Sequence, residues 1–463
     1  MAATKDLLLE KLRSGALMTR AERFRLTFLL ALPAILAQLS MCLMSYIDAA
    51  MVGRLGSAQA AAIGLVSTTT WIFGSFCYAN SSGFSVQIAH RIGAGDFRTA
   101  REIFRQGLFT VLAFTAVLCA LGVIISGPLP RWLGGTPEIL SDASSYFLIY
   151  ALFLPVLQIT VFSEASLIAS GNMKVPSITS LAMCGMDVVF NYLFIFVLDM
   201  GVKGAALGTG LAELCAGCFL FAYTSLKSPA LSQKGHSISS RNVKRISKRA
   251  FEISWPLWLQ NLVSRGAYIA ATVIVAPLGT IAIAANSFAV IAEGFCYLPG
   301  YGMQDAATTL VGQSLGAKRN DLARSFSRIT VLSGAALMGV LAVLMYAFAP
   351  QIMGLLSNDA SVIGLGAECL RIEAWAEVLY GVSIVAYGCC VGAGDTLVPS
   401  AINLLSMWVI RLGLALVLIP RFGLEGYWVA MAVELSVKGI IFAVRLRGGK
   451  WMKTKLTNDE YNS

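Results

Sequence analysis

An aspartate interrupts the first long apolar stretch of this sequence. Arg25 and Arg54 enclose 28 residues, and Asp48 is the only charged residue among them. A helix needs about 20 apolar residues to cross a bilayer core of about 30 Å. A carboxylate inside such a helix is costly unless it is paired, hydrated or protonated, so by default it marks a functional site. We therefore take Asp48 as a candidate for binding a cation or a proton.

Charged residues in later apolar runs form two candidate ion pairs. When residues are counted from the turn between the two runs, Arg411 is level with Glu434, and Arg265 is level with Glu293. Arg265 and Arg411 are the basic residues that we place within apolar runs. Removing one partner of a buried pair leaves an unpaired charge, which is strongly destabilising. We expect a structural ion pair between Arg411 and Glu434.

Several other chemistries lack their residues in this chain. The ten cysteines lie almost entirely inside apolar runs, where we interpret them as small buried side chains, and there are only two histidines. No phosphate-binding G-x-x-x-x-G-K-[ST] loop and no H-E-x-x-H motif occurs. Two G-x-G-D motifs resemble those of intramembrane aspartyl proteases, but both fall at helix ends, where Gly and Asp form turns. We expect neither an enzyme nor a bound cofactor.

The composition indicates the elements that must hold these residues. The chain is 57% hydrophobic and only 13% charged, whereas soluble proteins carry about 25% charged residues. The first 25 residues are polar and basic, and the apolar run after them is too long for the core of a signal peptide. We therefore predict an all-α membrane protein that crosses the bilayer twelve times. The predicted spans are 26–52, 61–89, 104–126, 146–170, 175–198, 204–226, 250–276, 281–312, 329–350, 372–392, 397–420 and 426–446.

The distribution of Lys and Arg predicts the orientation of these spans. If the amino terminus is cytoplasmic, basic residues concentrate in the cytoplasmic segments. The external loops then hold only Arg54, Arg131, Lys203, Arg371 and Arg421. This bias places both termini in the cytoplasm. The net charge of +10 is then explained by orientation and by contact with anionic lipid, and not by nucleic acid.

The two halves of the sequence repeat each other at an offset of 223 residues. The matches include Pro33 with Pro256, Gly56 with Gly279 and Gly171 with Gly394. Each half contains six predicted spans, so both enter the membrane from the same side. We predict two pseudo-symmetric six-helix lobes around a central cavity, residues 1–226 and 250–463 with a polar tail, joined by a basic linker at 227–249. Such repeats are typical of secondary transporters.

Four further motifs give the chain its resemblance to a known family. They are Asp48-Ala-Ala-Met-Val-Gly53, Arg91-Ile-Gly-Ala-Gly95, Thr309-Leu-Val-Gly-Gln-Ser-Leu-Gly-Ala317 and Gly392-Ala-Gly-Asp-Thr396. Over essentially its whole length the chain resembles the multidrug and toxic compound extrusion (MATE) family, in particular its bacterial NorM- and DinF-like members. The resemblance implies alternating-access export of organic, often cationic and amphipathic compounds in exchange for Na⁺ or H⁺.

The resemblance also implies a cation site in the amino-terminal half. The matching positions are Asp48, Asp187, Asn191 and Thr209, with the acid and the amide of the fifth span exchanged relative to the family. Asp48, Asn191 and Thr209 lie at similar depths from the external surface, and Asp187 lies one turn deeper than Asn191 on the same helix face. Such oxygen ligands suit a hard cation such as Na⁺. Alternatively, Asp48 and Asp187 would share a proton.

Other candidate residues remain open to two interpretations. Glu213, one turn beyond Thr209, would either extend the cation site or make a structural hydrogen bond. Glu293 would either pair with Arg265 or contact substrate or a proton, and Glu377 is a further candidate for such contact. The acid that some family members carry in the seventh or tenth span is absent, because Ser264 and Tyr380 occupy those positions. A coupling site of that kind in the second half is therefore not expected.

We expect an ion-coupled exporter of small organic compounds, monomeric and located in the plasma membrane. An alternative is a flippase for lipid-linked precursors from a related superfamily. Such a protein would need a strongly basic cavity, and we assign partners to both basic residues in the apolar runs.

Overall fold

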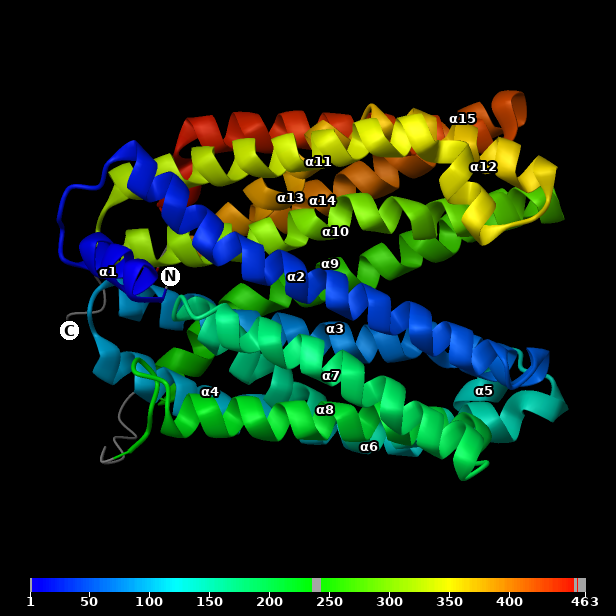
Figure 1. Ribbon diagram of the computed structural model, residues 1–463, viewed down its shortest axis with the longest axis horizontal. Helices are drawn as coiled ribbons and strands as arrows, with labels where there is room; N and C mark the ends of the chain where they lie inside the picture. Colours follow the sequence, from blue (N-terminus) through cyan, green and yellow to red (C-terminus); the bar gives the residue numbers. More distant parts are fainter. Residues whose placement is uncertain (1, 235–242, 454–455, 457–463) are drawn as a thin grey trace. The chain divides into compact units, whose positions relative to one another are not determined.

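The computed structural model describes residues 2–234, 243–453 and 456, and all its regular elements are helices (Figure 1). The middle of the predicted linker and most of the polar carboxy-terminal tail lie outside the described residues. By their internal contacts the described residues fall into two compact units. We call Leu39–Trp258 the amino-terminal unit, and Met1–Gln38 together with Leu259–Ser463 the carboxy-terminal unit.

Two long helices contribute to both units. Helix α2 (Arg20–Gly53) begins in the carboxy-terminal unit and continues into the amino-terminal unit after Gln38. Helix α9 (Val243–Val275) does the opposite and changes unit after Trp258. The units therefore exchange the first part of each sequence repeat.

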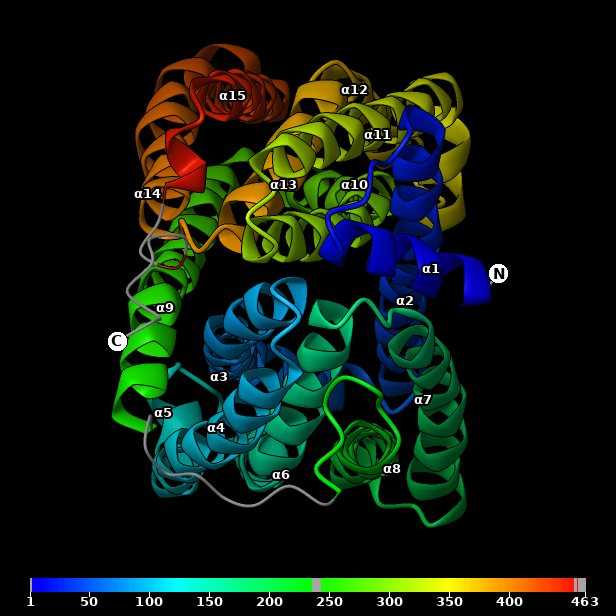
Figure 2. The same ribbon diagram turned by 90° about the vertical axis from the view of Figure 1, so that its left-hand side faces the viewer.

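The amino-terminal unit is a helix bundle built around α6. Its helices are α3 (Ser57–Gly93), α4 (Phe97–Ser126), α5 (Leu129–Trp132), α6 (Pro137–Ala169), α7 (Lys174–Tyr192), the π turn η1 (Leu193–Val197) and α8 (Gly201–Leu226). Helix α6 packs against α3, α4 and α8, and α7 packs against α8 (Figure 2). Asp96 begins α4 by accepting a hydrogen bond from the backbone N–H of Thr99 at 3.0 Å, as an N-cap residue does.

The carboxy-terminal unit is built around α10. Its remaining elements are α1 (Ala2–Arg13), η2 (Ala276–Leu278), α10 (Thr280–Gly316), α11 (Asn320–Leu356), α12 (Ala360–Ala374), α13 (Glu377–Gly392), α14 (Leu397–Leu405), η3 (Ser406–Leu412), α15 (Gly413–Gly448) and η4 (Lys450–Met452). Helix α10 packs against α11, α12 and α13, and α13 also packs against α15.

The described helices contain the predicted number of membrane spans. Ten are long and apolar enough to cross a bilayer, and α12 with α13, bent by 58°, form one further broken span. The longest of the ten, Leu397–Gly448, reverses at Gly423, where φ is 57° and ψ is −136°, and so holds two spans. The prediction of twelve spans in an all-α membrane protein is thus confirmed.

The internal repeat is visible in the backbone. Helices α3 and α10 cover 57–93 and 280–316, and α4 and α11 begin at residues 97 and 320, all at the predicted offset of 223. Matching glycines take similar positive φ angles: Gly171 and Gly394 have 86° and 83°, and Gly201 and Gly423 have 55° and 57°. The two repeats therefore share turns as well as helices.

Candidate functional site

The structure brings together three of the four residues predicted for the cation site. Asp48 lies near the end of α2, and Asp187 and Asn191 lie four residues apart on α7. Asn191 Nδ2 donates hydrogen bonds to Asp48 Oδ1 at 2.9 Å and to Asp187 Oδ2 at 3.0 Å. One amide thus joins two carboxylates from two helices, all within the amino-terminal unit.

The arrangement leaves oxygen atoms without a donor. Asp187 Oδ1 and Asn191 Oδ1 are buried and have no hydrogen-bond partner among the described residues. A buried polar atom without a partner costs about 1–3 kcal/mol, so such an atom in a functional position points to a ligand. Carboxylate and amide oxygens are the ligands that hard cations prefer. The group therefore has the donor set of a small cation site.

Helix α8 approaches Asn191 closely through a glycine. A Cβ atom added at Gly208 would lie 2.1 Å from Asn191 Oδ1, so no other residue fits there without a shift. Thr209 is the next residue along α8, and its hydroxyl makes no hydrogen bond among the described residues. Its role as a ligand stays a prediction, and Gly208 is a packing residue that the sequence analysis missed.

Glu213 lies further along α8 and is half-buried. The Thr160 hydroxyl of α6 donates to its backbone carbonyl at 3.4 Å, which ties α6 to α8 at this level. That bond uses the main chain of Glu213 and leaves both interpretations of its side chain open.

The predicted ion pair between Arg411 and Glu434 is confirmed. Arg411 Nη2 lies 2.7 Å from Glu434 Oε2, and both side chains are buried. Glu434 Oε1 accepts a second hydrogen bond from Ser406 Oγ at 2.7 Å and lies 3.1 Å from Lys438 Nζ. Lys438 is a basic residue inside α15 that the sequence analysis assigned to the tail. Its position four residues after Glu434 was the available signal.

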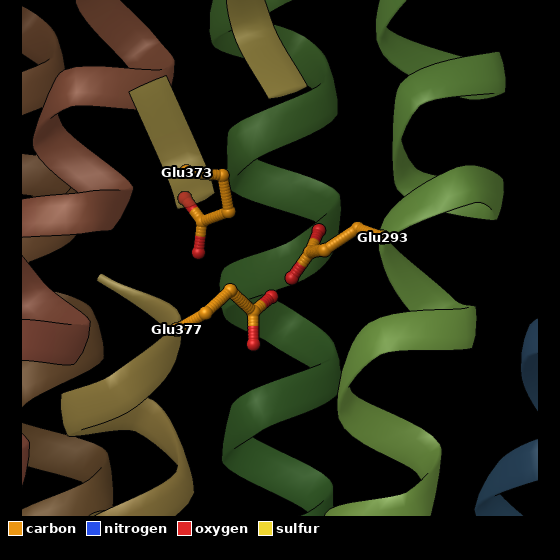
Figure 3. A group of neighbouring side chains, drawn as sticks. All are labelled: Glu293, Glu373 and Glu377. Carbon is orange, nitrogen blue, oxygen red and sulfur yellow. The ribbon is translucent and has the colours of Figure 1, made fainter. Parts of the chain in front are cut away.

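The predicted pairing of Arg265 with Glu293 stays a prediction. Arg265 Cζ lies 5.9 Å from the centroid of the Tyr268 ring, a cation–π distance. The buried carboxylate of Glu293 lies beside those of Glu373 and Glu377, and the three point toward one another (Figure 3). Glu373 was not among the predicted site residues, although it lies one helical turn before Glu377 in the sequence.

The fold and these sites define a class of protein. Bilayer-length helices in two repeated sets, with carboxylates buried at mid-helix, are the features of a secondary transporter. The MatE family model matches residues 33–193 and 256–417, one match in each repeat. The chain belongs to the MatE family, which confirms the resemblance seen in its motifs.

Known proteins of similar sequence cover nearly the whole chain. It is 25% identical over 434 residues to a "Probable multidrug resistance protein NorM" of Chromobacterium violaceum, spanning 90% of this chain and 92% of that protein. A protein of the same name from Thermotoga maritima is 23% identical over 438 residues, spanning 93% and 94%.

Solved structures share the fold. A mutant of the Vibrio cholerae MATE transporter VcmN superposes with a TM-score of 0.88 at 19% identity, covering 95% of this chain and 99% of that one. A transporter of the MOP superfamily from Pyrococcus furiosus superposes with a TM-score of 0.87 at 19% identity, covering 96% and 99%. The protein is therefore a multi-pass membrane transporter with the MATE fold.

Proposed function

We propose that this protein is a secondary active antiporter that exports small organic compounds in exchange for Na⁺ or H⁺. The observation that carries the proposal is the Asp48–Asn191–Asp187 group, in which one amide joins two carboxylates and two buried oxygens have no donor. A coupling ion must bind and leave in every cycle, and such a group can exchange a cation or a proton without covalent chemistry.

The sequence relatives support the substrate class. Proteins named as multidrug resistance proteins match the chain over about nine-tenths of its length. We infer organic, cationic and amphipathic substrates for this chain too. We further propose alternating access, a monomer in the plasma membrane, and both termini in the cytoplasm.

The lipid-linked flippase is less well supported. It would need exposed cations to hold a phosphate, whereas Glu434 pairs with both Arg411 and Lys438. The MOP-superfamily relative from Pyrococcus furiosus is described as having a binding pocket of reversed polarity that suggests a different function. That description belongs to that protein, and it shows that polarity is the property to compare.

The test is efflux of a cationic dye from cells that express the protein, driven by either a Na⁺ gradient or a pH gradient. We expect Asp48→Asn to lower the initial rate by more than about tenfold under the gradient that drives the wild type, since an antiporter that cannot exchange its ion cannot complete its cycle. Asp187→Asn should do the same.

A matched control comes from the same helix. Ser45 donates a hydrogen bond to the Met41 carbonyl of its own helix, so Ser45→Ala should leave efflux close to wild type. Membrane levels of each variant are measured by immunoblot. Undiminished efflux by Asp48→Asn under both gradients would refute coupling through this group, and no efflux by the wild type would refute export of such dyes.

A further inference from the structure

Three buried carboxylates gather in the carboxy-terminal unit, apart from the group around Asn191. Glu293 comes from α10, Glu373 from the end of α12 and Glu377 from the start of α13. One carboxylate oxygen from each lies within 4.8 Å of the others, and each side chain is at least nine-tenths buried. Figure 3 shows the three carboxylates pointing into one shared space.

These acids have no donors of their own. All four carboxylate oxygens of Glu373 and Glu377 are buried without a hydrogen-bond partner among the described residues. The neighbouring Cys296 thiol donates at 3.8 Å to the Met338 carbonyl. Nearly all buried polar atoms in proteins have partners, so four such atoms in one place indicate a missing ligand.

Nearby cations do not fill that role. Arg411 and Lys438 both form ion pairs with Glu434, at 2.7 Å and 3.1 Å. Those three residues together carry a single positive charge, whereas three ionised glutamates carry three negative charges. Uncompensated charges in a low-dielectric interior cost several kcal/mol each, so a bound cation or protons must balance the excess.

The backbone also breaks at this place. Helices α12 and α13 are bent by 58° relative to each other between Ala374 and Glu377. Glu377 lies in the first turn of α13, where the helix dipole favours a negative charge. Broken spans whose ends face a polar cluster are a common way of building ion sites in transporters. The break is a second observation, independent of the acids.

The spacing fits a hard cation. Two oxygens on opposite sides of an ion, each about 2.3–2.6 Å from it, lie about 5 Å apart. The separations in the cluster stay within that limit. The cost of moving an ion out of water grows with the square of its charge, so a deeply buried site that must release its ion favours a monovalent cation.

We propose that Glu293, Glu373 and Glu377 form a second cation site, which binds Na⁺ within the carboxy-terminal unit. This site uses acids at other positions than those occupied by Ser264 and Tyr380, so it is not the kind of site that the sequence excluded. Binding is tested without transport, and the proposal does not rest on the function proposed above.

The test is equilibrium binding of radioactive Na⁺ to the purified protein in lipid nanodiscs, at constant ionic strength with N-methylglucamine as the replacing cation. The background is Asp48→Asn, which silences the amino-terminal group. We expect this variant still to bind one Na⁺. Adding Glu373→Gln or Glu377→Gln should weaken that binding by more than about tenfold, because each removes one of three charged ligands.

The control is Glu368→Gln on the same helix as Glu373. Glu368 is exposed and paired with Arg371, so this change should leave Na⁺ binding unaltered. Folding is followed by the melting temperature, which Na⁺ should raise in the Asp48→Asn background and no longer raise after Glu373→Gln. Binding unaffected by both glutamine variants would overturn the proposal. So would an Asp48→Asn protein that binds no Na⁺, as a site for protons alone predicts, or Mn²⁺ that displaces Na⁺ at equimolar concentration.

Discussion

At the scale of single residues, this protein buries acids in three different ways. Asp48 and Asp187 share the amide of Asn191, Glu434 is saturated by cations and a hydroxyl, and Glu373 and Glu377 have no donor among the described residues. A saturated acid contributes to structure, because its charge is already balanced. An acid with free oxygens is destabilising until a ligand arrives, so it is the candidate for function.

The saturated acid leads to a stability prediction. We expect Glu434→Leu to lower the free energy of unfolding by about 3–5 kcal/mol, because it leaves two buried cations unpaired. Arg411→Met should cost less, since Lys438 continues to pair with Glu434 at 3.1 Å. The measurement is denaturant unfolding of the purified protein in detergent, with the exposed Glu368→Gln as control. A larger loss for Arg411→Met than for Glu434→Leu would contradict the assigned network.

At the scale of elements, hydropathy predicted the long helices and failed where charge and bending coincide. Span 10 was expected at 372–392, whereas α13 begins at Glu377 and is preceded by the separate helix α12. Helix α12 carries Glu368, Arg371 and Glu373, which reduce its hydropathy, so it was taken as external loop. Helix α1 was missed because it is short and rich in charge, although it buries Leu8, Leu9 and Leu12.

The turns of the repeat allow an element-scale prediction. Gly201 and Gly423 take φ angles of 55° and 57°, and a Cβ at either would meet no atom within 4 Å. Alanine there is opposed by backbone conformation alone, and we expect each variant to lose about 1–2 kcal/mol of stability. Gly185 lies inside α7, also in open space, so Gly185→Ala should be neutral or stabilising. Melting temperatures compare the three, and the strain interpretation fails if Gly201→Ala melts with Gly185→Ala.

At the scale of the whole molecule, the repeat was readable from sequence and the composition of the compact units was not. The offset of 223 residues follows from paired glycines and prolines, which the turns require in both halves. The exchange of the first parts of α2 and α9 depends on which helices pack together, and hydropathy carries no such information. In the same way, Asp187 and Asn191 were predictable by their spacing, whereas the meeting of Glu293 with Glu373 and Glu377 depends on the bend after α12.

Orientation is the remaining whole-molecule property, and it decides whether transport is export. The basic residues predict that the linker faces the cytoplasm and that the turn before α3 faces outward. Exposed residues in the two places are Lys227 and Ser57, which become labelling sites through Lys227→Cys and Ser57→Cys in a variant whose ten native cysteines are replaced. In intact cells a membrane-impermeant maleimide should label only Ser57→Cys, and in permeabilised cells it should label both. The cysteine-free parent must retain dye efflux, which shows that it folds. Labelling of Lys227→Cys in intact cells would reverse the predicted orientation and make the protein an importer of the compounds it carries.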